Sequence, residues 1–355
     1  MAPKVVGKVI HQIEAKFGKM TVTRGKRHMF VGMDIEFQAD GTVALSMEEY
    51  IEECVALYEP QLKTYKTPAT GSLIDDDTPE KAEEQRESDA DLFHHATAKL
   101  LFAAKRARID IDLAVSFICT RVAKPTLGDK EKLLRTMGYL KGTIGLKRVM
   151  GMLNGVYMYT WVDTSYGIHR DLKGHNGGTV SLGRGVTLHG CSKQKINTKS
   201  STESEIVGAS DFLPTTIWAK YFLEAQGYKV VRNVFFQDNM ITIKMLKNGR
   251  SSTSSKSRHI HIRYFFTKDI LEQNDVEVQY CATNQMIADY YTKPLQGKQF
   301  YTLRDLIMGT KPMEANTTAK ERVVESPRII SKRTRKNPKN AAYVAHERKI
   351  VNICC

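Results

Sequence analysis

The stretch Tyr157–Gly167 reads YMYTWVDTSYG, an apolar run with aromatic and β-branched side chains that ends in a single aspartate, Asp163. Such a run is typical of a buried β-strand, which we expect over residues 157–162. Two further apolar runs, Thr179–Leu182 and Val186–Cys191, are separated by Gly183-Arg184-Gly185 and predict a pair of strands joined by a tight hairpin.

The pattern then alternates between helix and strand. A long helical segment runs from Ser201 to Gln226, and Pro214 is expected to end or kink it. The remaining predicted elements are a strand at Asn233–Gln237, a helix after Asn239, a helix at 263–273, a strand at Val276–Cys281 and a helix at Asn284–Tyr291. This order indicates an α/β fold in which helices flank a mixed sheet.

Four acidic residues stand at the ends of these elements: Asp163, Glu205, Asp238 and Asp289. Each alone is more typical of a cap, a turn or a helix first turn, and Glu203 competes with Glu205 two positions away. Gathered at strand ends, such carboxylates repel one another unless a cation lies among them. Oxygen ligands favour Mg²⁺, with Mn²⁺ as the alternative, and two such ions about 4 Å apart can promote phosphodiester cleavage.

Five pieces in order carry a family resemblance: YTWVDTSYGIHRDLKGHNGG, LGRGVTLHGCSKQKINTKSSTESEIVGAS, FFQDNMITI, SKSRHIHIRYFF and IADYYTKPL. Through them, residues 157–309 resemble the ribonuclease H domain of Ty1/copia-type retrotransposon polyproteins. The resemblance implies a ribonuclease H-like sheet and a site of Asp163, Glu205, Asp238 and Asp289 that binds two Mg²⁺ ions. Glu205 is preferred over Glu203 because the family's acid stands just before the position of Ile206. The activity implied is endonucleolytic, metal-dependent hydrolysis of the RNA strand of RNA–DNA hybrids.

The resemblance continues upstream. KFGKMTVTRGKRHMFVGMDIEF and MEEYIEEC are similar to the end of the copia-type reverse transcriptase palm, with its hairpin, and to the start of the thumb. The Tyr-X-Asp-Asp turn of that polymerase is absent here, so DNA synthesis is not expected from this chain alone, and the missing polymerase portion is a candidate partner. The predicted division is a partial palm hairpin and thumb start at 1–60, an acidic linker at 61–89, connection helices at 90–150, a ribonuclease H-like domain at 157–309 and a basic, disordered tail at 310–355.

Several basic side chains are further candidates for the site. His259 matches the family's Lys/Arg-His-Ile position and is a candidate catalytic residue, although a structural histidine that caps the helix is an equal alternative. Six residues are candidates for contacts with nucleic acid, or are merely solvated charges in turns. These are Lys193, Lys195 and Lys199 around the third strand, and Arg24, Lys26 and Arg27 in a hairpin turn near Gly25.

The composition limits the class of partner. Lys and Arg number 53 against 39 Asp and Glu, giving a net charge of +14, and this balance favours nucleic acid. Residues 311–355 hold eleven Lys/Arg and four Glu, which is +7, or half of that charge. No apolar run is long enough to span a membrane, and the six cysteines show no zinc-ligand spacing, so we expect a reducing, cytoplasmic location, with a nuclear phase left open.

Two functions from different classes fit these patterns. The first is the hybrid-specific nuclease, favoured because all four carboxylates are present. The second is a non-catalytic nucleic-acid-binding fragment or relic of a retrotransposon polyprotein.

Overall fold

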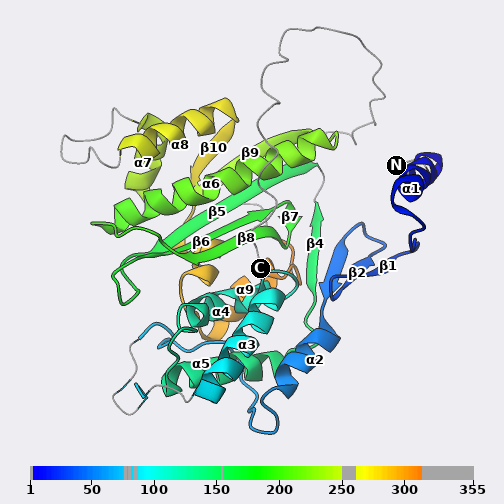
Figure 1. The fold of residues 1–355 in the computed structure, drawn as a ribbon. Coiled ribbons are helices and arrows are strands. Elements are labelled where there is room, and N and C mark those ends of the chain that lie inside the picture. Colours follow the sequence, from blue (N-terminus) through cyan, green and yellow to red (C-terminus); the bar gives the residue numbers. More distant parts are fainter. Residues whose placement is uncertain are drawn as a thin grey trace. The chain divides into compact units, whose positions relative to one another are not determined.

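The computed structural model describes residues 3–75, 78, 81–83, 87–152, 155–249 and 261–313, and within them two five-stranded sheets with flanking helices (Figure 1). The fold is of the mixed α/β class, as expected from the alternation of strands and helices. No helix among these residues is long and apolar enough to cross a bilayer.

The first sheet has the order β1-β2-β3-β4-β7. It begins after helix α1, and its strands are antiparallel along the hydrogen-bonded edges from β1 to β7. The elements are α1 (Pro3–Phe17), β1 (Arg27–Phe30), β2 (Met33–Phe37), β3 (Val43–Ser46), helix α2 (Glu48–Ala56), β4 (Arg148–Met152) and β7 (Gly183–Arg184). Strand β3 therefore finds its second neighbour about a hundred residues later in the chain, in β4.

The hairpin turn predicted near Gly25 is not observed; the hairpin instead joins β1 to β2. The turn consists of Val31 and Gly32, which both have positive φ, of 51° and 71°, as a two-residue hairpin turn requires. Arg24 and Lys26 instead lie before β1, and Arg27 is its first residue, so these three side chains are not in the hairpin turn.

Helices occupy most of residues 87–141: α3 (Glu87–Ala104), the short 3₁₀ helix η1 (Ile109–Ile111), α4 (Asp112–Cys119) and α5 (Leu127–Lys141). Helix α5 begins at a capping box, in which the Thr126 hydroxyl accepts from the Asp129 N–H and the Asp129 carboxylate accepts from the Thr126 N–H.

The second sheet has the order β10-β9-β5-β6-β8. Strand β6 is antiparallel to both β5 and β8, whereas β9 is parallel to β5 and β10 is parallel to β9. Its elements are β5 (Val156–Ser165), β6 (His175–Ser181), β8 (Val186–Lys193), helix α6 (Ser201–Ala225), β9 (Val230–Gln237), α7 (Met240–Asn248), α8 (His261–Gln273), β10 (Val276–Tyr280), the 3₁₀ helices η4 (Thr283–Gln285) and η5 (Ile287–Tyr291), and α9 (Gly297–Ile307). This is the ribonuclease H-like mixed sheet that the sequence predicts.

Helices cover this second sheet on both faces (Figure 1). On one face, α6, α7 and α8 form a core that includes Val162, Phe212 and Phe235. On the other face, Trp161 and Phe236 join a larger core that also contains side chains of α2 to α5, η5 and α9. The hydrophobic core thus continues across the predicted segment boundaries, which themselves stay predictions.

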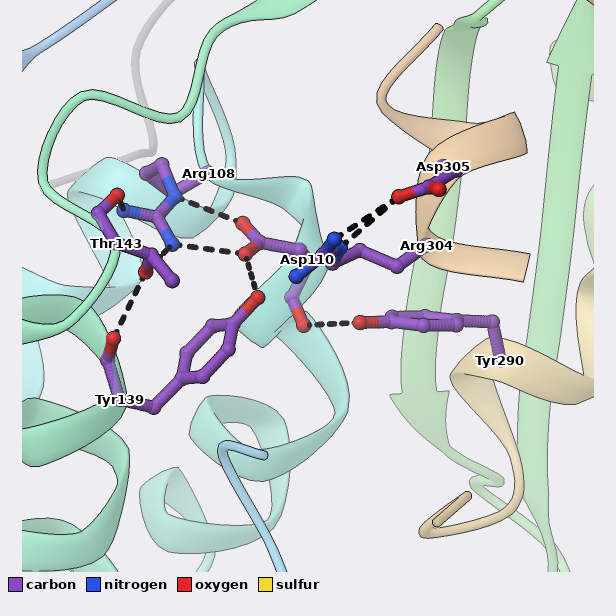
Figure 2. Close-up of polar contacts among 7 residues, drawn as sticks. All are labelled: Arg108, Asp110, Tyr139, Thr143, Tyr290, Arg304 and Asp305. Atoms are coloured by element: carbon purple, nitrogen blue, oxygen red, sulfur yellow. Dashed lines mark hydrogen bonds and ion pairs between the residues drawn. The ribbon is translucent and has the colours of Figure 1, made fainter. Parts of the chain in front are cut away.

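A buried ion pair lies where the helical region contacts the segment that carries Asp289 (Figure 2). Arg108 donates through Nε and Nη2 to both carboxylate oxygens of Asp110, at 2.9 and 2.8 Å, and both side chains are 0% exposed. The hydroxyl of Tyr139 donates to the same carboxylate, and that of Tyr290 donates to the Asp110 carbonyl. Because Tyr290 belongs to η5, this network links η1 and α5 to the segment that carries Asp289.

Three sequence expectations need correction. Helix α6 continues through Pro214 to Ala225, so the proline does not end it. The predicted last helix is two short 3₁₀ helices, and Asp289 lies in the second. The packed part of the chain also extends past residue 310, because Met313 is buried and Lys311 pairs with Asp305 at 3.1 Å. The remainder of the predicted tail lies outside the described residues.

Candidate functional site

Three carboxylates meet at one edge of the second sheet. Asp163 comes from β5, Glu205 from the second turn of α6, and Asp238 from the residue directly after β9. One oxygen from each lies within 4.8 Å of the other two. Asp163 and Glu205 are buried, at 2% and 7% exposure, and Asp238 is half-buried.

The close packing of α6 on β5 positions Glu205 next to Asp163. A Cβ added to Gly208, one turn after Glu205, would lie 2.2 Å from the Thr164 methyl group, which is less than any real contact allows. A side chain at position 208 would therefore hold the start of α6 away from β5. Asp238 reaches the same place because β9 runs parallel to β5, so that both strands end at one edge of the sheet.

Polar neighbours orient the three carboxylates. The amide of Gln237 donates to Glu205 at 3.1 Å, while its carbonyl oxygen accepts from the backbone N–H of Asp238 at 2.7 Å. The hydroxyl of Thr292 donates to Asp163, and that of Thr283 donates to Asp238 at 3.2 Å. Gln237 is fully buried, so it links the positions of two of the acids.

Glu203, the alternative to Glu205 in the sequence, contacts the start of α6 and is not one of the three clustered acids. Its carboxylate accepts from the Lys199 N–H at 2.8 Å, and its own N–H donates to the Ser200 hydroxyl at 3.2 Å. These contacts cap the N-terminus of α6. The geometry therefore favours Glu205 as the second acid of the cluster.

Asp289 lies beside the cluster and forms an ion pair with Lys293. The ammonium of Lys293 is 2.7 Å from Asp289 Oδ1 and 3.6 Å from Asp163 Oδ2. Asp289 is 1% exposed, and Lys293 is 40% exposed at the side chain. The fourth predicted acid is thus near Asp163 but is not part of the triplet within 4.8 Å.

The electrostatics of the cluster favour a bound cation. Burial, followed by the charge of Asp289, raises the pKa of Asp163 to about 7. Burial, followed by the charge of Asp163, raises the pKa of Glu205 to about 8. Burial also raises the pKa of Asp289, against the effect of Lys293. Near neutral pH, full ionisation is therefore unfavourable without a cation, and an all-oxygen donor set fits a hard divalent ion such as Mg²⁺.

The other predicted site residues are not drawn into this cluster by any contact that we observe. His259 lies outside the described residues. Lys193 pairs with Asp171 at 2.8 Å, whereas Lys195 and Lys199 are exposed on the segment that leads into α6. Arg27 pairs with Glu36 of the neighbouring strand at 3.0 Å, and Arg24 and Lys26 are exposed.

Sequence reasoning missed three residues at the site: Gln237, Thr292 and Lys293. A weak signal existed for each. Gln237 is a polar residue at the end of an apolar strand, and Thr292 and Lys293 follow Asp289 directly in DYYTKPL. Their contacts with Glu205 and Asp163 could not be deduced, because α6 and β5 are distant in the chain.

Comparisons with known proteins agree with the resemblance found in the sequence. The chain is 26% identical over 267 residues to a retrovirus-related Pol polyprotein from transposon TNT 1-94 of Nicotiana tabacum, covering 74% of this chain and 20% of the relative. It is 25% identical over 217 residues to a putative transposon Ty5-1 protein of Saccharomyces cerevisiae, covering 59% and 67%. It is also 21% identical over 315 residues to a truncated transposon Ty1-A Gag-Pol polyprotein of the same yeast, covering 83% and 26%.

These matches confirm the similarity to Ty1/copia-type retrotransposon Pol polyproteins, at modest identity. The chain spans only about a fifth of the length of the tobacco relative. No protein-family model matches the chain.

Among solved structures, the chain is similar to RNase H1 from the halophilic archaeon Halobacterium salinarum, with 11% identity and a TM-score of 0.27, over 37% of this chain and 90% of the other. The N-terminal RNase H domain of a Mycobacterium tuberculosis protein gives 9% identity and the same TM-score, over 42% and 98%. Similarities with TM-scores this low support no conclusion beyond the strand order already described.

Proposed function

We propose that this chain is a nuclease of the ribonuclease H type, which hydrolyses the RNA strand of RNA–DNA hybrids in a metal-dependent reaction. One observation carries the proposal: Asp163, Glu205 and Asp238 meet within 4.8 Å at the edge of a ribonuclease H-like sheet. The similarity to retrotransposon Pol polyproteins supports the same class of activity, and the polymerase portion of such a polyprotein is the proposed partner.

In this proposal, Asp163, Glu205 and Asp238 hold a divalent ion, and Asp289 is placed to share a second. Ions bound in such a site activate a water and stabilise the charge on the leaving oxygen of a phosphodiester. The chain's own polar groups keep the ligands in place: Gln237 holds Glu205 relative to the end of β9.

Recognition of the hybrid is proposed to depend on duplex shape and on 2′-hydroxyl groups, as is usual for double-helical RNA. Lys195 and Lys199 are exposed near the first turn of α6 and are candidates for contacts with phosphates. Lys193 is a weaker candidate, since its ammonium is paired with Asp171.

The test compares two neutral substitutions in a Mg²⁺-dependent cleavage assay with a labelled RNA–DNA hybrid. Asp238→Asn removes a ligand charge and is expected to lower the rate at least about a hundredfold, since charge stabilisation at such sites is worth several kcal/mol. The matched control is Asp269→Asn on the exposed surface of α8, which should cleave at the parent rate. Equal rates for Asp238→Asn and the parent would remove Asp238 from the site.

A second pair identifies the acid of α6. Glu205→Gln should abolish cleavage, whereas Glu203→Gln should retain it with a modest loss of stability from the weakened cap, about 1 kcal/mol. A parent chain that binds the hybrid but cleaves it in neither Mg²⁺ nor Mn²⁺ would instead establish the non-catalytic alternative.

A further inference from the structure

Lys293 occupies an unusual position for a surface lysine. Its ammonium lies between two buried carboxylates, 2.7 Å from Asp289 and 3.6 Å from Asp163. Asp163 is also one of the three acids of the cluster, so the lysine contacts the edge of the candidate metal site itself. The side chain is 40% exposed, so it is not enclosed by the core.

Glu205 and Asp238 have different charged neighbours from Asp289. The second oxygen of Glu205 and the end of β9 are tied together by Gln237, and no lysine or arginine within the described residues forms an ion pair with Glu205 or Asp238. Asp289, in contrast, already has a positive partner in Lys293. Within the described residues, the positive charge of Lys293 therefore lies at the Asp163 end of the triplet and at Asp289, whereas Glu205 and Asp238 have no lysine or arginine partner.

A second divalent ion held by Asp163 and Asp289 would bind the same two carboxylates that the ammonium now contacts. Two positive charges at this separation repel each other strongly, because even a partly screened pair a few ångströms apart interacts by several kcal/mol. The ion and the ammonium consequently exclude each other from the pair.

We propose that Lys293 is an exchangeable counter-cation, which neutralises the Asp163–Asp289 pair until a second divalent ion displaces it. This inference rests on the proposed function, because it presumes that the cluster binds divalent ions. Lys293 is then a positioning residue that makes the two ions bind unequally. The ion at the Asp163–Glu205–Asp238 triplet binds first, and the second binds only at higher concentration.

Metal binding provides the direct test, with Mn²⁺ alone as the probe and calorimetry and spin counting as the readouts. In Lys293→Met, a substitution of similar length without charge, the second Mn²⁺ should bind at least about tenfold more tightly than in the parent. The first should change less than about threefold. The control Lys298→Met removes the same charge from an exposed site in α9 and should match the parent, and Lys293→Arg should preserve the weak second site.

Stability in the absence of metal provides a second, independent readout. Without its ammonium, the Asp163–Asp289 pair is uncompensated, so metal-free Lys293→Met should melt below both the parent and Lys298→Met at pH 8. Mg²⁺ should remove this difference. A lysine that merely braces η5 would cause the same loss with and without Mg²⁺, and that result would overturn the proposal, as would an unchanged second Mn²⁺ affinity.

Different results would contradict the nuclease activity and the exchange of Lys293 for a metal ion. If the parent binds two Mn²⁺ ions unequally and Lys293→Met equalises them, the exchange is supported even where no hybrid is cleaved. If the parent cleaves hybrid but Lys293→Met binds Mn²⁺ as the parent does, the nuclease proposal stands and the exchange is wrong. If the parent binds no Mn²⁺, both the metal site and the exchange are wrong.

Discussion

The buried pair of Arg108 and Asp110 offers a sharp test of how the helical region is joined to the ribonuclease H-like sheet (Figure 2). Asp110→Asn keeps the shape of the side chain but removes its charge. The Arg108 guanidinium, which is 0% exposed, would then keep only neutral acceptors: the new amide oxygen and, in Thr143, the carbonyl at 2.9 Å and the hydroxyl at 2.7 Å.

Removing one partner of a buried ion pair costs about 3–5 kcal/mol, because the other charge is left uncompensated. At about 2 °C per kcal/mol for a chain of this size, the melting temperature should fall by roughly 6–10 °C. The assay is thermal unfolding followed by circular dichroism, at pH 7.5 and with fixed salt.

Two matched variants sharpen the result. Asp305→Asn removes a partner from Arg304 in the same region, but that pair is partly exposed, so the loss should stay below about 1 kcal/mol. The double change Arg108→Met with Asp110→Leu buries no charge and should recover most of the loss. An Asp110→Asn chain that melts within about 2 °C of the parent would refute the reasoning, since it would show that Arg108 is solvated or neutralised by another route.

Three further outcomes are expected. Burial lowers the pKa of His175 to about 3 and that of His169 to about 4, so the folded chain binds fewer protons than the unfolded chain below pH 6.5, and stability should fall as the pH falls. The free energy of unfolding can be measured in urea at pH 7.5 and at pH 5.0. Its decrease between these pH values should be about 2 kcal/mol smaller for His175→Asn than for the parent, and equal decreases would contradict this. Gly208→Val should force α6 away from Thr164 and weaken Mn²⁺ binding in calorimetry; unchanged affinity would show that the helix start does not set the cluster. Truncation after Met313 removes ten Lys/Arg and four Glu, so the plot of log affinity for duplex DNA against log salt should flatten by about 0.9 for each lost phosphate contact, and an unchanged slope would exclude the tail from binding.

Local pattern was sufficient for most of the second sheet. The apolar runs that became β5, β9 and β10 are short, bounded by polar residues and rich in β-branched or aromatic side chains, which are local properties. Asp163 and Asp238 could be identified for the same reason, since each interrupts or follows such a run. Their order along the chain, together with the family resemblance, was enough to propose a shared site.

Local pattern failed where the deciding partner is distant in sequence. The turn was predicted near Gly25 and not at Val31-Gly32, because only the pairing of β1 with β2 and of β2 with β3 sets the register. Pro214 was expected to end or kink α6, yet the helix continues to Ala225, because packing of the helix on the sheet outweighs the single missing hydrogen bond.

The amino-acid sequence by itself determined the strand and helix order of the ribonuclease H-like region and the four acids that stand at its element ends. Only the tertiary structure showed that three of these acids lie within 4.8 Å of one another, and that Glu203, two residues before Glu205, contacts the start of α6 instead. The same holds for Lys293, whose proposed role depends on its contact with Asp163, 130 positions earlier. Charges interact over a few ångströms, so their function is set by three-dimensional neighbours that local sequence patterns do not reveal.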